Sequence, residues 1–248
     1  MLFTNKTIVV TGAGSGIGRA FATGFCADGA AVVSIGRSRA SLEETARLCA
    51  GRMQFVVGDI GREDDVRRLF AEAQRLHGKV DMLVNNAAQY PKRAFLQMSM
   101  EEWNEVIRTN VMGMAMCCRA ALPGMLERGF GRIVNVGTFA WMGPIVDSSA
   151  YSASKAAVRP LTKALAAEVD RARYPDVLIN ELIPGEVRTG MSDVGEDPAA
   201  IYVHVRLVAS LPRGGPTGQT FFQSAPWVEN HGLRARLGRV LARVRPRL

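Results

Sequence analysis

The segment Thr11–Gly18 has the sequence TGAGSGIG and directly follows the β-branched run at residues 7–10. A strand that ends in a glycine-rich turn and leads into a helix is the usual setting of a dinucleotide-binding loop. Gly12, Gly16 and Gly18 would let the backbone approach a pyrophosphate, whose charge the helix N-terminus then stabilises. The alternative, a tight strand-to-helix connection without a ligand, is disfavoured because this turn lies at the first junction of an alternating chain.

The chain alternates short apolar runs with amphipathic stretches, which indicates repeated βαβ units. Such units build a parallel sheet covered on both faces, with ligands at the carboxyl edge of the strands. The predicted fold is α/β, a doubly wound, Rossmann-like parallel sheet. The expected strands are Thr7–Thr11, Ala31–Ile35, Gln54–Val57, Met82–Asn85, Arg132–Val136, Val177–Leu182 and Gln219–Phe222. The expected helices are Ile17–Asp28, Ser41–Cys49, Glu63–Leu76, Glu101–Leu126, Tyr151–Arg171 and Ala199–Ser210.

The composition supports one domain rather than two, because 248 residues that are 48% hydrophobic can bury one sizeable core. We expect a dinucleotide-binding and catalytic domain over residues 1–225 and a basic extension over residues 226–248. No apolar run approaches the ~20 residues of a membrane span, no leader precedes the first strand, and the four cysteines form no CxxC pair. These features predict a cytoplasmic protein, and three isolated histidines predict no metal site.

The formal net charge of +8 is unevenly distributed, because six arginines lie between Arg234 and Arg247. The rest of the chain is therefore nearly neutral. A basic tail on a nearly neutral body favours nucleic acid only weakly, so we expect no nucleic-acid partner.

The second expected strand ends in SIGRSR at residues 34–39, where a NAD-binding chain would carry an acidic residue for the adenosine ribose. Arg37 and Arg39 can instead pair with a 2′-phosphate, which a carboxylate would repel. The pattern therefore predicts NADP(H), although a solvated loop arginine is the alternative reading of Arg37.

Tyr151 and Lys155 lie four residues apart in YSASK and would point the same way on a helix. A nearby ammonium favours the phenolate and lowers the phenol pKa from ~10 towards the range useful for acid–base catalysis. A hydroxyl that works with this pair has four candidates, namely Thr138, Ser148, Ser149 and Ser152.

The chain resembles the short-chain dehydrogenase/reductase family, single-domain type, in five segments that occur in order. They are TGAGSGIG, NNAA (Asn85–Ala88), TNVMG (Thr109–Gly113), YSASK (Tyr151–Lys155) and PGEVRT (Pro184–Thr189). The resemblance extends from about Lys6 to Gln219. It implies nicotinamide-dependent hydride transfer to or from a carbon that bears oxygen.

The resemblance implies a catalytic role for four residues, namely Asn110, Thr138, Tyr151 and Lys155. Tyr151 would be the general acid in carbonyl reduction, Lys155 would bind the nicotinamide ribose, and Asn110 would organise a water that connects Lys155 to solvent. The family usually places a serine where this chain has Thr138, whose hydroxyl offers the same donor and acceptor but adds a methyl group. Thr138 is therefore the predicted partner of Tyr151, with an impaired site as the alternative. Ser148 and Ser149 lie too close to the tyrosine in sequence, and Ser152 should face away.

The resemblance also implies cofactor contacts. Asp59 matches a residue near the adenine amino group, and Thr189 matches a hydroxyl near the nicotinamide carboxamide. The full set predicted for NADP(H) is Gly12, Ser15, Gly16, Ile17, Gly18, Arg37, Asp59, Ile60, Asn86, Ala87, Tyr151, Lys155, Pro184, Gly185, Val187 and Thr189.

The connection from Thr189 to the expected helix at Ala199 is short, so little chain is left to form a lid over a substrate. An open cleft would suit a bulky or tethered substrate, or loose specificity. The expected substrate-facing residues are Thr138, Phe139, Trp141, Gln89, Tyr90, Glu186 and Met191. A place in the core fits Phe139 and Trp141 equally well, and Glu186 could instead be solvated.

The apolar residues of the basic extension, from Leu233 to Leu248, fall on one helical face, and its arginines mostly fall elsewhere. This pattern predicts a basic amphipathic C-terminal helix. Docking against the same protein is favoured over a membrane surface or an acidic partner.

These features together predict an NADPH-dependent oxidoreductase that reduces a ketone with Tyr151 as general acid. One alternative is a non-catalytic dinucleotide-binding sensor or scaffold, for which Thr138 is the direct support. Another is a ketoacyl reductase whose acidic carrier protein docks at Arg128 and Arg173. The resemblance also implies a homodimer or homotetramer, paired through the long helices at Glu101–Leu126 and Tyr151–Arg171.

Overall fold

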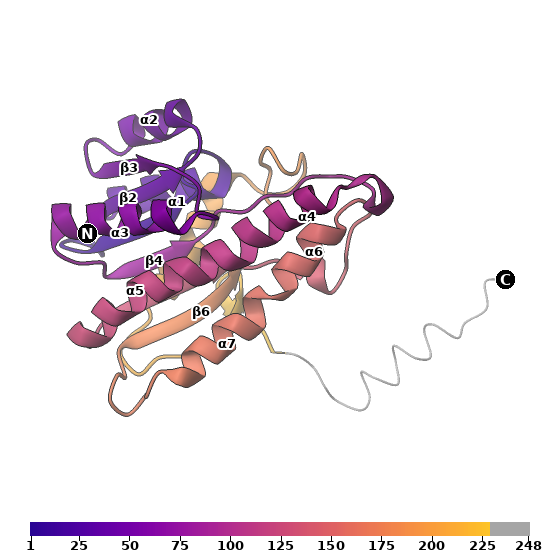
Figure 1. Ribbon diagram of the computed structural model, residues 1–248. Coiled ribbons are helices and arrows are strands. Elements are labelled where there is room, and N and C mark those ends of the chain that lie inside the picture. Colours follow the sequence, from indigo (N-terminus) through magenta and orange to yellow (C-terminus); the bar gives the residue numbers. More distant parts are fainter. Residues whose placement is uncertain (229–248) are drawn as a thin grey trace.

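An eight-stranded sheet forms the centre of the protein in a computed structural model that describes residues 1–228 (Figure 1). The strands are β1 (Thr7–Thr11), β2 (Ala31–Gly36), β3 (Met53–Val57), β4 (Met82–Asn85), β5 (Gly131–Val136), β6 (Val177–Ile183), β7 (Thr220–Phe222) and β8 (Ala225–Pro226). Their order is β3-β2-β1-β4-β5-β6-β7-β8, and all neighbours are parallel except β7 and β8. The direction of winding reverses between β1 and β4, which opens a crevice at the carboxyl edge.

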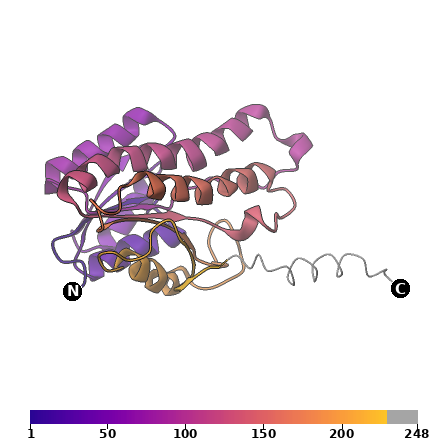
Figure 2. The same cartoon turned by 90° about the horizontal axis from the view of Figure 1, so that it is seen from below.

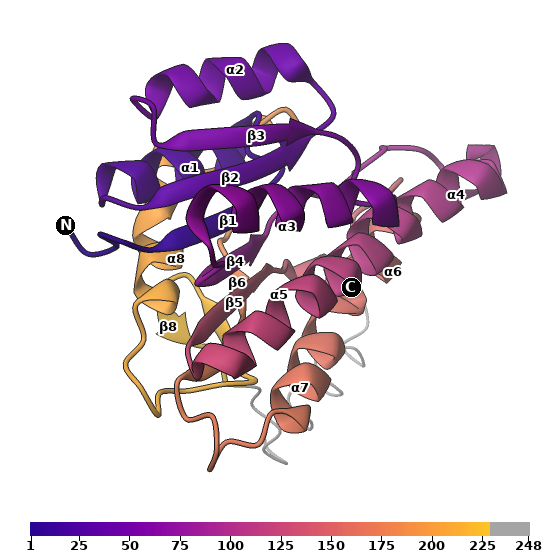
Figure 3. The same ribbon diagram turned by 60° about the vertical axis from the view of Figure 1, so that its left-hand side comes forward.

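Helices cover both faces of this sheet. They are α1 (Gly16–Ala27), α2 (Arg39–Leu48), α3 (Glu63–His77), α4 (Met100–Ile107), α5 (Met114–Arg128), α6 (Ser149–Ala156), α7 (Val158–Glu168) and α8 (Tyr202–Ala209). Figure 3 shows α3, α5 and α7 in front of the sheet and α1 and α8 behind it. Figure 2 shows the same layers from below. No helix within residues 1–228 is long and apolar enough to cross a membrane.

Two apolar clusters lie on the two faces of the sheet, and the pleat of each strand divides its side chains between them. In β1, Ile8 and Val10 pack in the cluster that contains Phe21 of α1, whereas Val9 packs in the cluster that contains Leu69 of α3. A strand buried on both faces needs apolar residues at nearly every position. This requirement explains why the strands could be recognised in the sequence as uninterrupted apolar runs.

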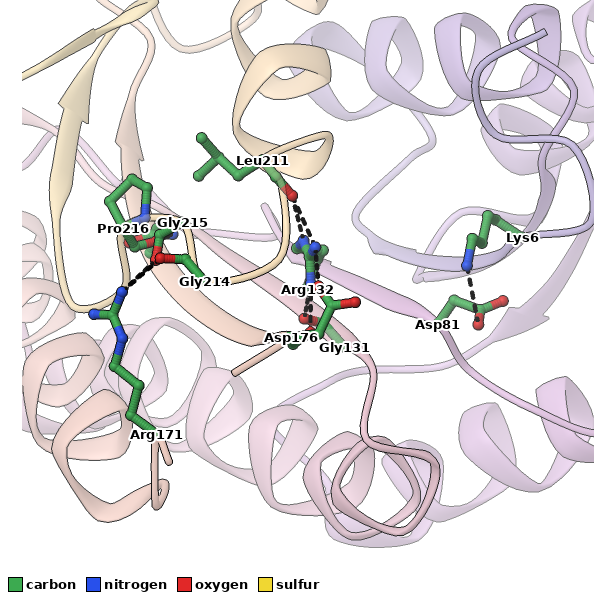
Figure 4. A network of polar contacts seen from close by, with 11 residues as sticks. Lys6, Asp81, Gly131, Arg132, Arg171, Asp176, Leu211, Gly214, Gly215 and Pro216 are labelled. Carbon is green, nitrogen blue, oxygen red and sulfur yellow. Dashed lines mark hydrogen bonds and ion pairs between the residues drawn. The ribbon is translucent and has the colours of Figure 1, made fainter. Parts of the chain in front are cut away.

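The amino edge of the sheet is closed by the buried side chain of Arg132, at the start of β5 (Figure 4). Its guanidinium donates to the carboxylate of Asp176 at 2.5 Å and to the carbonyl oxygen of Leu211 at 2.7 Å. On the same edge, Lys6 forms an ion pair with Asp81 at 4.0 Å. These bonds attach the loops before β6 and after α8 to the amino edge of the sheet. They fix the sheet at the end opposite to its carboxyl edge.

All seven predicted strands are confirmed with ends within one residue, but the structure corrects two helices. The helix predicted over residues 101–126 is divided by a π-helical turn, Arg108–Gly113. Gly113 lies against Ile60 so closely that a Cβ atom would meet its side chain at 2.8 Å. The helix predicted over residues 151–171 is divided into α6 and α7, because Pro160 has no N–H for the carbonyl group four residues earlier.

Two further differences concern the C-terminal part. The last predicted helix begins as a 3₁₀ turn, Pro198–Ile201, before α8. The short strand β8 was not predicted, and it spans the expected boundary at residue 225. The predicted amphipathic helix lies, beyond Val228, outside the described residues.

Candidate active site

A cavity of about 840 Å³ lies along the carboxyl edge of the sheet, where the strand order reverses. Its wall is made by the segments that follow β1, β2, β3, β4, β5 and β6. All sixteen residues predicted to bind the cofactor line this wall. The topology therefore brings together positions that are as far apart in sequence as Gly12 and Thr189.

The glycine turn after β1 has a backbone shape that larger residues would disturb. Gly12 and Gly16 have φ values of 72° and 52°, in the left-handed region that favours glycine. A Cβ atom on Gly18 would overlap the carbonyl oxygen of Gly12. The side-chain amide of Asn86 donates to the carbonyl oxygens of Thr11 at 3.0 Å and of Gly12 at 3.3 Å, which holds the turn in place.

Helix α1 begins within this turn, so the unpaired N–H groups of its first turn lie at the cavity wall. The first turn carries no acidic side chain. A concave backbone with an uncompensated helix N-terminus fits a pyrophosphate group in shape and charge.

The end of β2 places Arg37 on the same wall, exposed to solvent. Within residues 1–228 Arg37 has no hydrogen bond or ion pair, whereas Arg39 pairs with Glu43 at 3.7 Å. Ser38 caps α2, and its hydroxyl lies 2.9 Å from that of Ser41, also on the wall. Sequence reasoning missed both serines, although the preference for serine at a helix N-cap could have identified Ser38.

Tyr151 of α6 lines the cavity together with Thr138, which follows β5 and whose hydroxyl interacts with the phenol. Burial and the neighbouring phenol of Tyr90 together raise the pKa of Tyr151 to about 12, while the Thr138 hydroxyl opposes this rise. The ring centroids of Tyr90 and Tyr151 are 4.4 Å apart. Thr138 therefore occupies the place beside the tyrosine that the sequence register predicted for it.

Lys155 is buried one turn further along α6, and its Nζ donates to the carbonyl oxygen of Val136 at 2.8 Å. Burial lowers the pKa of Lys155 to about 8, while the carboxyl group of Glu181 raises it. The expectation of a lowered phenol pKa is wrong for this structure, because burial dominates at Tyr151 and raises its pKa. The ammonium group is bonded to Val136 and lies 6.0 Å from the centre of the Tyr151 ring.

Asn110 lies in the π-helical turn, where it is buried behind the cavity wall. Its side chain accepts from the amide of Gln89 at 2.7 Å and donates to the hydroxyl of Ser154 at 2.9 Å. These bonds fix the segment after β4 against α6. The expected connection from Asn110 to Lys155 through a water stays a prediction.

The residues predicted to face the substrate divide into two groups. Thr138, Gln89, Tyr90, Glu186 and Met191 line the cavity, but Phe139 and Trp141 do not. The ring of Phe139 packs 5.3 Å from that of Phe222, and the ring of Trp141 packs 6.2 Å from that of Trp227. Both aromatic residues are half-buried and belong to neither apolar cluster of the core, so they form a separate aromatic group outside the cavity.

The cavity wall also includes residues that sequence reasoning did not select, among them Ile145, Ser148 and Val194. Ile145 and Val194 are largely exposed and form an apolar rim. The hydroxyl of Ser148 donates to the carbonyl oxygen of Ile145 rather than to Tyr151. These residues lie in loops without a periodic pattern, so no signal marked them. No group of three His, Cys, Asp or Glu side chains that could hold a metal occurs in the described residues.

The doubly wound sheet and its glycine turn define a dinucleotide-binding α/β protein, and comparison with known proteins specifies it further. The model of the family described as short chain dehydrogenase matches residues 6–198. An uncharacterized oxidoreductase of Staphylococcus aureus (strain MRSA252) is 34% identical over 192 residues, covering 77% of this chain and 82% of that protein. The Dehydrogenase/reductase SDR family member 4 of Bos taurus is 38% identical over 200 residues, covering 79% and 71%.

A solved structure described as a short chain dehydrogenase/reductase family protein superposes with a TM-score of 0.81 at 33% identity, covering 90% of this chain and 97% of that one. The chain belongs to the short-chain dehydrogenase/reductase family of oxidoreductases. Members of this family use nicotinamide dinucleotides, act on small molecules and are usually oligomeric.

Replacing Gly18 with alanine is expected to weaken dinucleotide binding by at least about tenfold, because the added Cβ would displace the Gly12 carbonyl from the turn. Gly14→Ala is the matched control, since its Cβ would meet the side chain of Ser41 at 3.2 Å and no backbone atom closer than 3.7 Å. Binding is measured by nicotinamide fluorescence. Equal affinities of the two variants would contradict this account of the turn.

Proposed function

We propose that the protein is an NADPH-dependent reductase of ketone substrates, with Tyr151 as the general acid. The observation that carries the proposal is that the Tyr151 phenol and the Thr138 hydroxyl line the same cavity as the glycine turn, with Thr138 close enough to lower the phenol pKa. The Tyr151 and Thr138 hydroxyls lie in the same cavity as the expected dinucleotide site, so together they can bind and protonate the oxygen of a carbonyl group.

The protonation state of Tyr151 favours reduction over oxidation. With a pKa of about 12 the phenol is protonated near neutral pH, so it can donate a proton but cannot accept one. The nicotinamide dinucleotide, when bound, supplies the hydride. In this scheme Thr138 donates a hydrogen bond that polarises the carbonyl oxygen, and Tyr151 transfers its proton to the alkoxide as it forms. An alkoxide is more basic than a phenolate, so the transfer is favourable even at this raised pKa.

Lys155 has a supporting role in the same proposal. After the phenol has lost its proton, the nearby ammonium group stabilises the phenolate. The lysine is held in place by its bond to Val136, and its pKa of about 8 leaves it mostly charged at neutral pH. We expect the same ammonium to bind the nicotinamide ribose.

The choice of NADPH over NADH is supported by the end of β2. Arg37 extends from this wall with no ion pair within residues 1–228, and the hydroxyls of Ser38 and Ser41 lie on the same wall. A guanidinium with hydroxyl groups beside it matches a 2′-phosphate in charge and in hydrogen-bond donors. Gly36 is the last residue of β2, so no carboxylate opposes the phosphate there.

The alternatives lose support. The position of the Thr138 hydroxyl beside Tyr151 weakens the argument for a non-catalytic sensor. Arg128 ends α5 and donates to the carbonyl oxygen of Val80, and Arg173 stacks on Tyr174 in the loop before β6. Both arginines lie at the amino edge of the sheet, so they cannot guide a carrier-tethered substrate to the cavity.

A homodimer or homotetramer, a cytoplasmic location and a docking role for the basic extension remain parts of the proposal.

The proposal is tested by NADPH consumption in the presence of a panel of carbonyl compounds, chosen as aliphatic diketones, aromatic ketones, cyclic ketones, quinones and a ketoacyl thioester. The apolar rim at Ile145 and Val194 predicts the highest kcat/KM for bulky apolar ketones. We expect consumption that depends on the carbonyl compound. Binding of NADPH without consumption across the panel would favour the non-catalytic alternative.

A further inference from the structure

Glu181, in the interior of β6, is a fully buried carboxyl group that the proposed mechanism does not use. The hydroxyl of Thr220 donates to its Oε2 at 2.6 Å. Its Oε1 has no hydrogen-bond partner among residues 1–228. Burial of a carboxylate with an unpaired oxygen is costly unless opposite charges lie nearby. Charged groups near Glu181 must therefore offset the cost of burying its carboxylate.

Three cationic side chains from the helices packed on β6 lower the pKa of Glu181 through their charge, namely Arg159 and Lys163 of α7 and Lys155 of α6. Arg159 and Lys163 lie four residues apart on one face of α7, and Lys155 lies near the end of the preceding helix α6. The strand β7 contributes the hydroxyl of Thr220 and no charge, and the segment after β5 contributes Gly137. Burial raises the pKa of Glu181 above its ordinary value, and the Thr220 hydroxyl and the three cations offset this rise only in part.

Of these three cations, Lys155 depends most on the carboxylate. Lys163 is exposed and Arg159 is half-buried, so water can stabilise their charges. Lys155 is buried, and its ammonium group has lost that stabilisation. Glu181 is the charged group that opposes this loss, since it raises the pKa of Lys155 against the effect of burial.

The unpaired oxygen of Glu181 also lies directly behind the backbone that holds the catalytic groups. A Cβ atom on Gly137 would overlap Oε1, so the carboxylate fills the space that a side chain there would need. The preceding residue, Val136, accepts the bond from Lys155, and the following residue is Thr138. The carboxylate thus touches the segment that orients both side chains of the proposed mechanism.

We propose that Glu181 is a positioning residue for Lys155, whose buried carboxylate keeps the ammonium group charged in the interior and bonded to Val136. Its role in catalysis rests on the proposed function, but its effect on Lys155 does not. Removal of the negative charge should therefore make Lys155 lose its proton at lower pH, with or without a substrate.

The first test uses the full-length protein without added dinucleotide and compares melting temperatures of the wild type and Glu181→Gln from about pH 6 to about pH 9. The pKa of Lys155 is about 8 in the folded chain and has its ordinary value of 10.5 in the unfolded chain. Between pH 8 and pH 10.5 the unfolded chain therefore binds more protons than the folded chain. The contribution of Lys155 to the free energy of unfolding therefore rises with pH in that window. In Glu181→Gln the rise begins at lower pH, so the deficit in melting temperature should be largest near pH 6 and shrink towards pH 9.

Two controls separate this effect from a general loss of stability. Asp176→Asn also changes a carboxylate to an amide, but its partner Arg132 keeps its charge throughout, so its deficit should not vary over this pH range. In a Lys155→Met background, Glu181→Gln keeps only the change with pH that comes from the raised pKa of Glu181 itself, so the difference between the two backgrounds isolates Lys155. If Glu181→Gln does not fold, Thr220→Val, which removes the bond to Oε2, should show a smaller change with pH in the same direction.

The second test is the pH profile of kcat/KM with NADPH and a carbonyl substrate from the panel. The alkaline limb of the kcat/KM profile of Glu181→Gln is expected to lie about one pH unit below that of the wild type. A deficit in melting temperature that does not vary with pH, together with an unshifted limb, would overturn the inference. A deficit that shrinks with pH in a protein that reduces no carbonyl compound would uphold the inference and reject the proposed function.

Discussion

Tyr151→Phe is expected to lower kcat for carbonyl reduction by about a thousandfold, within the range that general acid catalysis contributes. The phenylalanine ring keeps the packing against Tyr90 but has no proton to transfer and no hydrogen bond to Thr138. The glycine turn and Arg37 are untouched, so the affinity for NADPH should stay within about threefold of the wild-type value. Stopped-flow or steady-state turnover, together with fluorescence titration, measures the two effects separately.

Tyr90→Phe is the matched control for this variant. Tyr90 lines the same cavity and its ring packs 4.4 Å from Tyr151, yet the mechanism gives its hydroxyl no proton to transfer. Its loss should change kcat by less than about tenfold. Equal losses in the two variants, or unchanged turnover in Tyr151→Phe, would remove Tyr151 from the role of general acid.

Arg37→Ala is expected to weaken NADPH binding by about 10- to 100-fold while leaving NADH binding nearly unchanged. This range corresponds to the loss of one charge-assisted contact to the 2′-phosphate, which NADH lacks. The loss should diminish at high salt, because Arg37 is exposed. Fluorescence titration with each dinucleotide measures the change.

Arg39→Ala provides the comparison, because Arg39 lies two residues further on and is paired with Glu43 at 3.7 Å. It should leave the ratio of the two affinities within about threefold of the wild-type ratio. A wild-type preference for NADH, or an equal effect of the two arginine variants, would contradict the assignment of Arg37 to the phosphate.

The sheet and the glycine turn could be predicted because their physical requirements are local. A parallel strand buried on both faces must be apolar at successive positions, as β1 is from Ile8 to Val10. The turn needs glycine where φ is positive, as at Gly12 and Gly16. The order of these elements then determines which loops meet at the carboxyl edge.

Features that depend on packing between distant segments could not be predicted. The π-helical turn ends at Gly113, which packs tightly against Ile60, a residue far away in sequence. Phe139 and Trp141 pack against the C-terminal strands, and no local pattern distinguishes that from facing a substrate. The raised pKa of Tyr151 reflects burial, which the spacing of Tyr151 and Lys155 does not reveal.

Glu181 illustrates the same limit at a charged position. In the run VLINELI of β6 a single glutamate is consistent with a residue that faces solvent at the edge of a sheet. Only the fold shows that its side chain is buried, bonded to Thr220 and directed at the backbone of Gly137. The sequence alone does not show that this buried carboxyl group lies near the cationic side chains of helices α6 and α7.

The central claim is hydride transfer from NADPH to a carbonyl carbon with Tyr151 as the proton donor. The most direct measurement uses NADPH that carries deuterium at the reactive C4 position, incubated with the wild type or Tyr151→Phe and the bulky ketones of the panel. We predict deuterium on the carbinol carbon of the alcohol formed by the wild type, and almost none with the variant. Tight NADPH binding without transfer of deuterium to any member of the panel, or equal transfer by the variant, would contradict the claim.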